Sequence, residues 1–388
     1  MRRLLSLVML LTFVSPMVPA ARAQDSATPT AGPLSSGLTV LANGLDSPRG
    51  FTWGPDGTLY LAVAGRGGDD LLPAAPGFTI HNGLTSSVAT VADGCTTPVV
   101  QGLVSTFWEE PGWLWGAMDV TFLNDELYVL VSGAGPAWAS PSSRSGVFRI
   151  NDDGTMTLVG DISSWLPEHP PQAAPPEMSP ENPDGSLFDL EATSDALLLS
   201  EAVNGLIIKV TPEGEISLLA DLSAQHPVPT GIAVDAEDNA YVAFETTPPY
   251  AEASTKVVKI TPDGTVSDAW TGLTRVADLI LGPDGMLYAA ELSTGNTETA
   301  PFVQPNTGRI VRQSGPDSLE VIAEGLDFPV GLGFGPDGAL YVSGPANGPT
   351  PADGANAGAG WLARVEMDGT TAEMPTGSTC ADMGTPAA

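Results

Sequence analysis

The sequence is poor in cysteine, histidine and positive charge. Its 388 residues include 2 Cys, 3 His and 14 Lys+Arg. Two cysteines exclude a four-Cys zinc site and a disulfide-dense scaffold. Because Asp+Glu number 46, the formal net charge is −32, and phosphate groups would repel such a chain. We therefore expect neither nucleic acid nor an anionic membrane as a partner.

Common catalytic motifs are also missing. The chain has no G-x-S-x-G, H-E-x-x-H or G-x-x-x-x-G-K-[ST] pattern. Its histidines, His81, His169 and His226, do not show the spacing of metal ligands. Carboxylates outnumber every other candidate catalytic group, so any catalysis is expected to use carboxylates or a metal ion.

The N-terminus has the three-part pattern of a secretory signal peptide. Arg2 and Arg3 precede the apolar run 4–14, and the small residues Ala21 and Ala23 follow it. Cleavage after Ala23 would remove three arginines and no acid, whereas an uncleaved anchor is the alternative. We expect a signal peptide over 1–23, a flexible mature start over 24–36 and a secreted or periplasmic protein without a membrane span.

One phrase recurs six times: a small or acidic residue, an apolar strand, a turn and a second apolar strand that often carries Tyr. The first residues of the six copies, used below as reference positions, are Gly50, Asp119, Asp189, Gly231, Asp278 and Gly331. A second hairpin follows each copy, which gives four strands per repeat. Apolar alternation favours strands over helices, and such repeats are typical of a β-propeller. The sequence therefore predicts an all-β, six-bladed propeller of four antiparallel strands per blade over residues 37–377.

The segment 37–45 (GLTVLANGL) matches the last strand of a blade but has no blade before it. We expect it to supply the outer strand of the sixth blade, closing the ring and protecting the sheet edges. Blades one and six would then be neighbours, so a Cys95–Cys380 disulfide is geometrically feasible. Two unpaired thiols are the alternative, and residues 378–388 are expected to form a C-terminal tail.

Acidic residues gather at the predicted mouth of the central channel. Asp119, Asp189 and Asp278 occupy the reference position that is Gly in the other three blades, and Glu201 and Glu291 share a position at the end of the second strand. Converging carboxylates would repel one another, and Ca²⁺ or Mg²⁺ would relieve that repulsion. The alternative is that the aspartates accept hydrogen bonds from nearby backbone N–H groups while water solvates the glutamates.

Two arginines and two tryptophans are candidate ligand-binding residues on the same face. Arg49 and Arg275 would either form ion pairs or hold an acidic group of a ligand. Trp113 and Trp115 belong to the connection 107–115, which has three Trp in eight residues. This connection is either a lid or stacking platform for a ligand or a packed loop between two blades.

Several segments, taken in order, carry a family resemblance. They include 44–70 (GLDSPRGFTWGPDGTLYLAVAGRGGDD), 182–210 (NPDGSLFDLEATSDALLLSEAVNGLIIKV) and 328–344 (FPVGLGFGPDGALYVSG). The chain resembles the ScyD/ScyE family of exported propellers. That resemblance implies a six-bladed propeller of NHL-like repeats and export, but brings no established activity. The sequence departs from the family after Gly68, where Cys and aromatic residues would be expected.

More remotely, the chain is similar to lactonase-like propellers, which hold a divalent cation with mixed Glu, Asn and Asp ligands. Asp189, Glu201 and Asn204 match that ligand set loosely. Together with Asp278 and Glu291 from the repeated positions, they make up the predicted metal site.

The sequence supports three functional hypotheses for a monomeric exported propeller. The first is a non-catalytic module that binds a small molecule or a secreted protein. Its candidate ligand-binding residues are Arg49, Trp113, Trp115, Asp119 and Arg275. The second is a divalent-cation-dependent hydrolase acting on lactones or esters. The third is an extracellular scaffold without a small ligand.

Overall fold

The computed structural model describes residues 37–75, 78–109, 112–138, 140–173, 184–225, 227–346 and 358–366. The predicted signal peptide, mature start and C-terminal tail lie outside these residues. Within them, no helix is long and apolar enough to cross a membrane.

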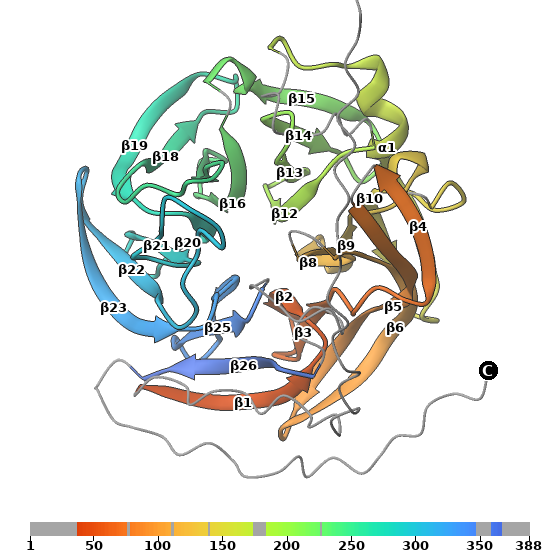
Figure 1. Cartoon of the computed structure of the whole chain (residues 1–388), viewed down its shortest axis with the longest axis horizontal. Helices are drawn as coiled ribbons and strands as arrows, with labels where there is room; N and C mark the ends of the chain where they lie inside the picture. The colour runs from red at the N-terminus through yellow and green to blue at the C-terminus, as the bar shows by residue number, and fades with distance from the viewer. Residues whose placement is uncertain are drawn as a thin grey trace, which may run out of the picture.

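The fold is an all-β propeller of six blades, as predicted (Figure 1). Each blade has four antiparallel strands from the channel to the rim; they follow one another in sequence except in blade 6, whose outer strand is β1, and the sheet of blade 1 has two further strands. Blade 1 contains β2 (Pro48–Trp53), β3 (Leu59–Val63), β5 (Phe78–Ala92) and β6 (Cys95–Trp108); blade 2 contains β8 (Ala117–Leu123), β9 (Glu126–Val131), β10 (Gly146–Ile150) and β11 (Met156–Asp161); blade 3 contains β12 (Leu187–Ala192), β13 (Leu197–Glu201), β14 (Leu206–Val210) and β15 (Ile216–Asp221). Blade 4 contains β16 (Val228–Val234), β17 (Ala240–Glu245), β18 (Thr255–Ile260) and β19 (Val266–Leu273); blade 5 contains β20 (Val276–Leu281), β21 (Leu287–Glu291), β22 (Gly308–Gly315) and β23 (Ser318–Leu326); blade 6 contains β24 (Gly331–Phe334), β25 (Leu340–Gly344), β26 (Gly360–Val365) and β1 (Leu38–Leu45).

The N-terminal strand closes the ring, which confirms the prediction for residues 37–45. Strand β1 pairs antiparallel with β26, with Leu38 opposite Val365. Leu38 is 3 % exposed and packs in the core between blades 5 and 6. Cys95 is disulfide-bonded, whereas Cys380, the other half of the predicted bridge, lies outside the described residues.

The recurring Asp-Gly turn and the following Tyr build both a hairpin and a seam between blades. In blade 6, Asp337 accepts hydrogen bonds from the Ala339 N–H at 3.1 Å and the Tyr341 hydroxyl at 3.0 Å. The Tyr341 ring then packs on Trp53 of blade 1, with centroids 5.1 Å apart. The same kind of contact joins Tyr60 to Phe122 and Tyr288 to Phe334. These turns therefore have a structural role on the face opposite the blade connections.

All six outer strands carry a β-bulge at the same point of the ladder. The bulged residues are Leu41, Val99, Val159, Leu219, Ala269 and Ile322. A bulge twists an edge strand and makes it a poor template for pairing with another chain. The six exposed rims are thus protected by one repeated irregularity.

Blade 1 departs from the regular unit. Its β5 and β6 have 15 and 14 residues, and their far ends pair with β4 (Asp70–Ala75) and β7 (Trp113–Trp115). This extension reaches blade 2 (Figure 1), where Ser140 donates a hydrogen bond to the Asn82 side chain. A Cβ on Gly68 would lie 2.5 Å from the Asn82 carbonyl oxygen. Glycine at this position therefore lets the connection between β3 and β4 cross the β5–β6 hairpin closely.

Candidate functional site

The innermost strands of the six blades surround the central channel (Figure 1). In five of the six blades, the pairing between the inner strand and the second strand shifts register at or next to the reference position. The five inner strands are β2, β8, β12, β16 and β20. Such a bulge re-aims side chains. The reference residue and the residue before it are therefore both placed to face the seam or the channel.

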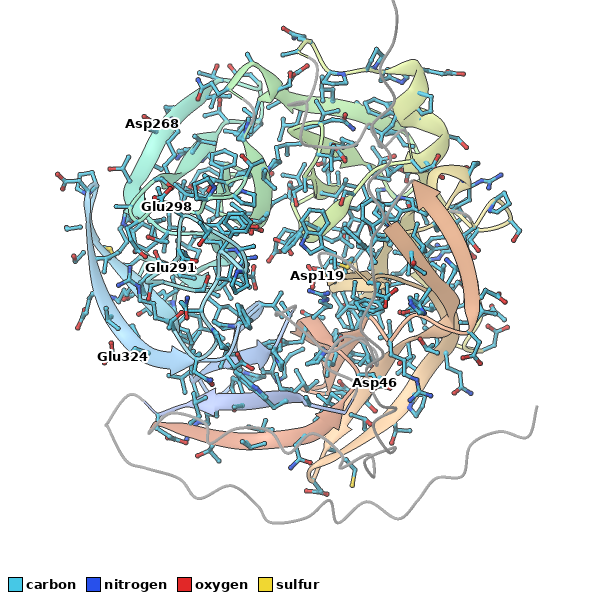
Figure 2. All side chains as sticks on the ribbon, in the orientation of Figure 1. Asp46, Asp119, Asp268, Glu291, Glu298 and Glu324 are labelled. Atoms are coloured by element: carbon cyan, nitrogen blue, oxygen red, sulfur yellow. The ribbon has the colours of Figure 1, made fainter. Side chains whose placement is uncertain are left out.

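The three reference aspartates connect neighbouring blades. The Asp119 carboxylate accepts the Val120 N–H of its own strand at 2.8 Å and the Leu190 N–H of blade 3 at 3.0 Å. Figure 2 shows Asp119 beside the channel. The contacts match the backbone-bonding alternative proposed for these aspartates from the sequence.

Asp189 and Asp278 repeat this arrangement in two other seams. Asp189 accepts the Ile232 N–H of blade 4. Asp278 accepts the Leu279 N–H at 2.7 Å and, across the seam, the Leu332 N–H of blade 6. All three aspartates therefore join the inner strand of one blade to that of the next.

The three reference glycines mark seams in which the neighbouring blade approaches too closely for a side chain. A Cβ on Gly50 would lie 1.7 Å from Asp119 Oδ1, and one on Gly231 would lie 2.4 Å from the Leu279 nitrogen. A Cβ on Gly331 would lie 2.7 Å from the Arg49 carbonyl oxygen. The alternation of Asp and Gly thus follows from the space available in each seam.

Burial and mutual repulsion favour the neutral form of these carboxyl groups. The pKa of Asp119 is raised well above its ordinary value by burial and by the charge of Asp189, to which Asp119 is hydrogen-bonded. Burial and Asp189 also raise the pKa of Asp278. Burial and the charge of Asp189 raise the pKa of Glu191 to about 8.

A small cavity of about 10 Å³, room for about one water molecule, opens at the channel among these residues. It is lined by Arg49, Gly50, Met118, Phe188, Asp189, Ala277, Asp278 and Val330. The structure thus brings together three residues singled out from the sequence: Arg49, Asp189 and Asp278. It adds the apolar neighbours Met118 and Phe188, which no motif indicated because each looks like an ordinary core residue.

The remaining predicted metal ligands lie away from this cavity. The Glu201 carboxylate accepts the Ser186 N–H at 2.8 Å and the Asn204 N–H at 2.6 Å, and burial raises its pKa to about 7. It holds two loops of blade 3 together. Asn204 therefore meets Glu201 within that blade, but neither residue reaches the channel aspartates.

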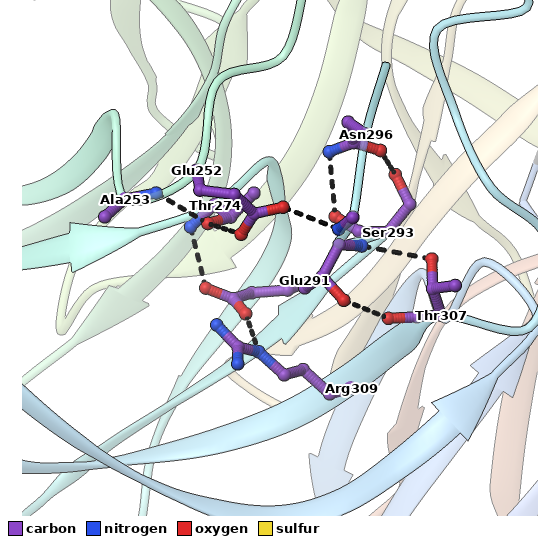
Figure 3. A network of polar contacts seen from close by, with 10 residues as sticks. Glu252, Ala253, Thr274, Glu291, Ser293, Asn296, Thr307 and Arg309 are labelled. Carbon is purple, nitrogen blue, oxygen red and sulfur yellow. Dashed lines mark hydrogen bonds and ion pairs between the residues drawn. The ribbon is translucent and has the colours of Figure 1, made fainter.

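Glu291 has the corresponding position in blade 5 (Figure 3). It accepts the Thr274 N–H at 2.7 Å and forms an ion pair with Arg309. Nearby, Glu252 accepts the Thr274 hydroxyl at 3.2 Å and the Gly295 N–H at 2.6 Å. This polar network ties the connection between blades 4 and 5 to the long loop of blade 5.

The predicted five-residue metal set is therefore divided among the channel and two blades. Across the described ranges, no group of three or more His, Cys, Asp or Glu side chains is arranged to hold a metal ion. Asp189 and Asp278 share the cavity, but Glu201, Asn204 and Glu291 do not join them.

Arg275 forms an ion pair, which was one of the two interpretations of this residue. Its guanidinium lies 2.6 Å from the Glu245 carboxylate and donates to the Ser293 hydroxyl at 3.3 Å. It also lies over the Tyr250 ring, 4.3 Å from the centroid. Arg275 is 7 % exposed, so these contacts fix the seam between blades 4 and 5.

The two predicted ligand-binding tryptophans belong to a packed cluster in which the extension of blade 1 meets blades 2 and 3. Trp113 and Trp115 lie in β7 and contact Trp108, with centroids 6.3 and 5.8 Å away. Trp115 also packs on Trp138 at 4.4 Å and donates from its indole to the Ser186 hydroxyl at 3.0 Å. Trp115 is buried and Trp113 partly buried, which fits the packed-loop interpretation better for Trp115 than for Trp113.

Comparison with known proteins gives the fold. No family model matches the chain, and no curated protein matches it. A calcium-binding protein, regucalcin, from Agrobacterium tumefaciens aligns at a TM-score of 0.52 and 16% identity, covering 87% of this chain and 95% of its own. A gluconolactonase from Xanthomonas campestris aligns at 0.51 and 13% identity, covering 87% and 99%. At these identities the likeness establishes a shared propeller fold.

Proposed function

We propose that this propeller is a non-catalytic module that binds a compact small molecule at the mouth of its central channel. The cavity carries the proposal, because it places the charged Arg49 among apolar side chains such as Met118 and Phe188. Small-molecule sites are typically concave, mostly apolar and supplied with a few polar groups. The enclosed space is about 10 Å³, enough for about one water molecule, so only a small group at the end of a compact ligand would enter it.

The test is to fill the cavity. Ala277 is fully buried and lines it, so Ala277→Leu would occupy space that a ligand needs. A panel of compact acids, amides, amines and lactones is screened by the rise in Tm that native-state binding produces. We expect at least one hit that Ala277→Leu abolishes and that Ala236→Leu, in an exposed turn, retains. No hit, or hits that survive Ala277→Leu, would contradict the proposal.

The second candidate is a divalent-cation-dependent lactone or ester hydrolase using Ca²⁺ or Mg²⁺. Asp189 and Asp278 in one cavity favour it, as do the names of the two solved structures with this fold, regucalcin and gluconolactonase. The donor set does not fit a cation well, because both carboxylates already accept backbone N–H groups. One equivalent of metal in purified residues 24–388, with a Tm lowered by chelator, would favour this candidate over the first.

Export and membership of the ScyD/ScyE family are also part of this proposal, and both rest on the sequence. Cleavage by a signal peptidase predicts a mature protein that begins at Gln24. N-terminal sequencing of protein recovered outside the cytoplasm tests this directly. A product that keeps Met1 would contradict it.

A further inference from the structure

The second and third strands of blade 5 are joined by a long loop, residues 292–307. In blade 3 the corresponding strands, β13 and β14, are joined by residues 202–205 alone. Glu201 and Glu291 have the same place immediately before these two connections. The extra length in blade 5 is therefore not needed to turn the chain, and its contacts indicate what it does.

Polar contacts hold the base of this loop (Figure 3). Thr294 donates from its N–H to the Thr307 hydroxyl at 3.1 Å and from its hydroxyl to the Thr307 carbonyl oxygen at 2.9 Å. The Gly295 N–H donates to the carboxylate of Glu252, which follows the second strand of blade 4, at 2.6 Å. These bonds keep the two ends of the loop together and fasten one of them to the neighbouring blade.

The tip of the loop is hydrogen-bonded within itself. The Thr297 N–H donates to the Phe302 carbonyl oxygen at 2.8 Å, and the Phe302 N–H donates to the Thr299 carbonyl oxygen at 3.0 Å. Residues 298–301 are exposed. A turn with internal hydrogen bonds and exposed residues can move as a unit without losing its own structure.

After its tip, the loop enters an apolar cluster at the channel. Val303 is 9 % exposed and belongs to one cluster with Ala277 and Val330, against which Phe302 and Phe188 also pack. Ala277, Val330 and Phe188 line the small channel cavity. The blade-5 loop thus shares an apolar cluster with three residues of the cavity wall.

Phe302 has a strained backbone conformation. Its φ is 64°, in the left-handed region that bulky side chains rarely adopt. The apolar contacts of Phe302 and Val303 oppose relaxation of this residue. If the loop swings away from the channel, those contacts are lost but the backbone can return to a negative φ. The strain therefore lowers the free energy needed to open the loop.

We propose that residues 292–307 form a lid that opens without unfolding of the propeller and exposes the channel cavity. Glu252 is its latch, through the Gly295 N–H, and Phe302 and Val303 are its apolar contact with the channel. The closed structure encloses room for about one water molecule, so a larger ligand needs the lid to open. That last step rests on the proposed function, whereas the opening itself does not.

The test measures how fast a buried thiol on the cavity wall is labelled. Ala277→Cys places the thiol on that wall, and Ala62→Cys places one in the core between blades 1 and 2; both alanines are fully buried. Iodoacetamide is added to folded protein of residues 24–388, mass spectrometry follows the reaction, and the unmodified protein gives the background. We expect Ala277→Cys to be labelled at least about tenfold faster than Ala62→Cys, because local opening is more frequent than global unfolding.

Two changes to the lid should speed the labelling of Ala277→Cys and leave that of Ala62→Cys unchanged. The first is Glu252→Ala, which removes the latch and should raise the rate severalfold. Its matched control is Glu298→Ala, in the exposed tip of the lid, which should leave the rate as it is.

The second change removes the lid altogether. Residues 292–308 are replaced by the segment 202–205 of blade 3, after which circular dichroism checks the fold. The exchange keeps the register, because Glu201 pairs with Leu206 as Glu291 pairs with Arg309. This chain should label at the Ala277→Cys position at least about tenfold faster than the chain with the lid.

Labelling of Ala277→Cys no faster than that of Ala62→Cys would overturn the inference, since the cavity would then open only when the propeller unfolds. A rate unchanged in the folded chain without the lid would also overturn it. If that chain does not fold, equal rates in Glu252→Ala and Glu298→Ala do so instead. None of these measurements uses a ligand, so the panel with Ala277→Leu decides the proposed function separately.

Discussion

The Asp119 carboxylate in blade 2 lies 3.0 Å from the backbone nitrogen of Leu190 in blade 3 and accepts its hydrogen bond. Asp189 and Asp278 make the corresponding contact in two further seams. The acidic mouth inferred from the sequence is thus mainly a set of contacts between blades. Asp189 and Asp278 also line the small channel cavity, together with Arg49.

Replacing Asp119 should destabilise the propeller. Asp119→Ala leaves the Val120 and Leu190 N–H groups without the acceptor they now share. An unsatisfied buried polar group costs about 1–3 kcal/mol, so we expect the free energy of unfolding to fall by about 2–4 kcal/mol. Urea denaturation measures it, with Asp152→Ala in an exposed turn as the control. A loss no larger than that of the control would contradict the assigned role.

Gly50 and Asp119 should show strong energetic coupling. Gly50→Ala alone places a Cβ against the Asp119 carboxylate and should cost at least about 2 kcal/mol, as overpacking does. In an Asp119→Gly background the same substitution meets open space and should cost much less. A double-mutant cycle by urea denaturation measures the difference. Simple additivity of the two substitutions would show that the contact does not determine the Gly at position 50.

Stability should decline as the pH rises from about 4 to about 8. The folded-state pKa values of Glu191 and Glu201, about 8 and about 7, lie above the ordinary Glu value of about 4.3. The folded state therefore binds more protons than the unfolded state in this window, so stability is fully present below the unfolded pKa and is lost through the folded pKa. Each such group contributes a slope approaching about 1.4 kcal/mol per pH unit.

Urea denaturation at pH 5, 6.5 and 8 tests this dependence. Glu191→Gln removes one titrating group and should flatten the slope between pH 5 and 8. Glu168→Gln, on an exposed residue, should leave the slope as it is. Stability that is constant or rises across the window would show that Glu191 and Glu201 ionise normally.

Strand β1, which closes the ring, should contribute more to the stability of the propeller than its place at the rim suggests. Leu38→Ala removes a buried side chain of β1 and should cost about 2–4 kcal/mol, the usual range for core leucines. Leu84→Ala is the matched control, since Leu84 is 66% exposed. Comparable small losses for both variants would mean that ring closure by β1 adds little to stability.

The fold was predictable because its signals are local. The Asp-Gly turns and the following tyrosines, such as Asp337 and Tyr341, recur with the strands they join. The blade-1 extension was not predicted, because β4 pairs with a strand end beyond the regular blade. Trp138 was also missed, since its contact with Trp115 depends on two connections meeting in space.

The candidate site was predictable only in part. The repeat pattern assigns Asp119, Asp189 and Asp278 to the first strands of their blades, and in the structure these are the inner strands β8, β12 and β20. Their partners are backbone N–H groups of the next blade, and no side-chain pattern identifies such a partner. Glu201 and Glu291 share a repeat position with each other, yet each serves its own blade, because a position repeated around a ring need not point at its centre.

The excess of acidic residues predicts a marked response to salt. With a net charge of −32, repulsion opposes the compact state, and screening reduces it. Raising NaCl from 10 to 300 mM should therefore increase Tm by several degrees. CaCl₂ at the same ionic strength should add only the small further effect expected of a divalent counterion. A saturable Tm increase at micromolar Ca²⁺ that is lost in Asp189→Asn would instead show a specific cation site, and would favour the hydrolase over the binding module.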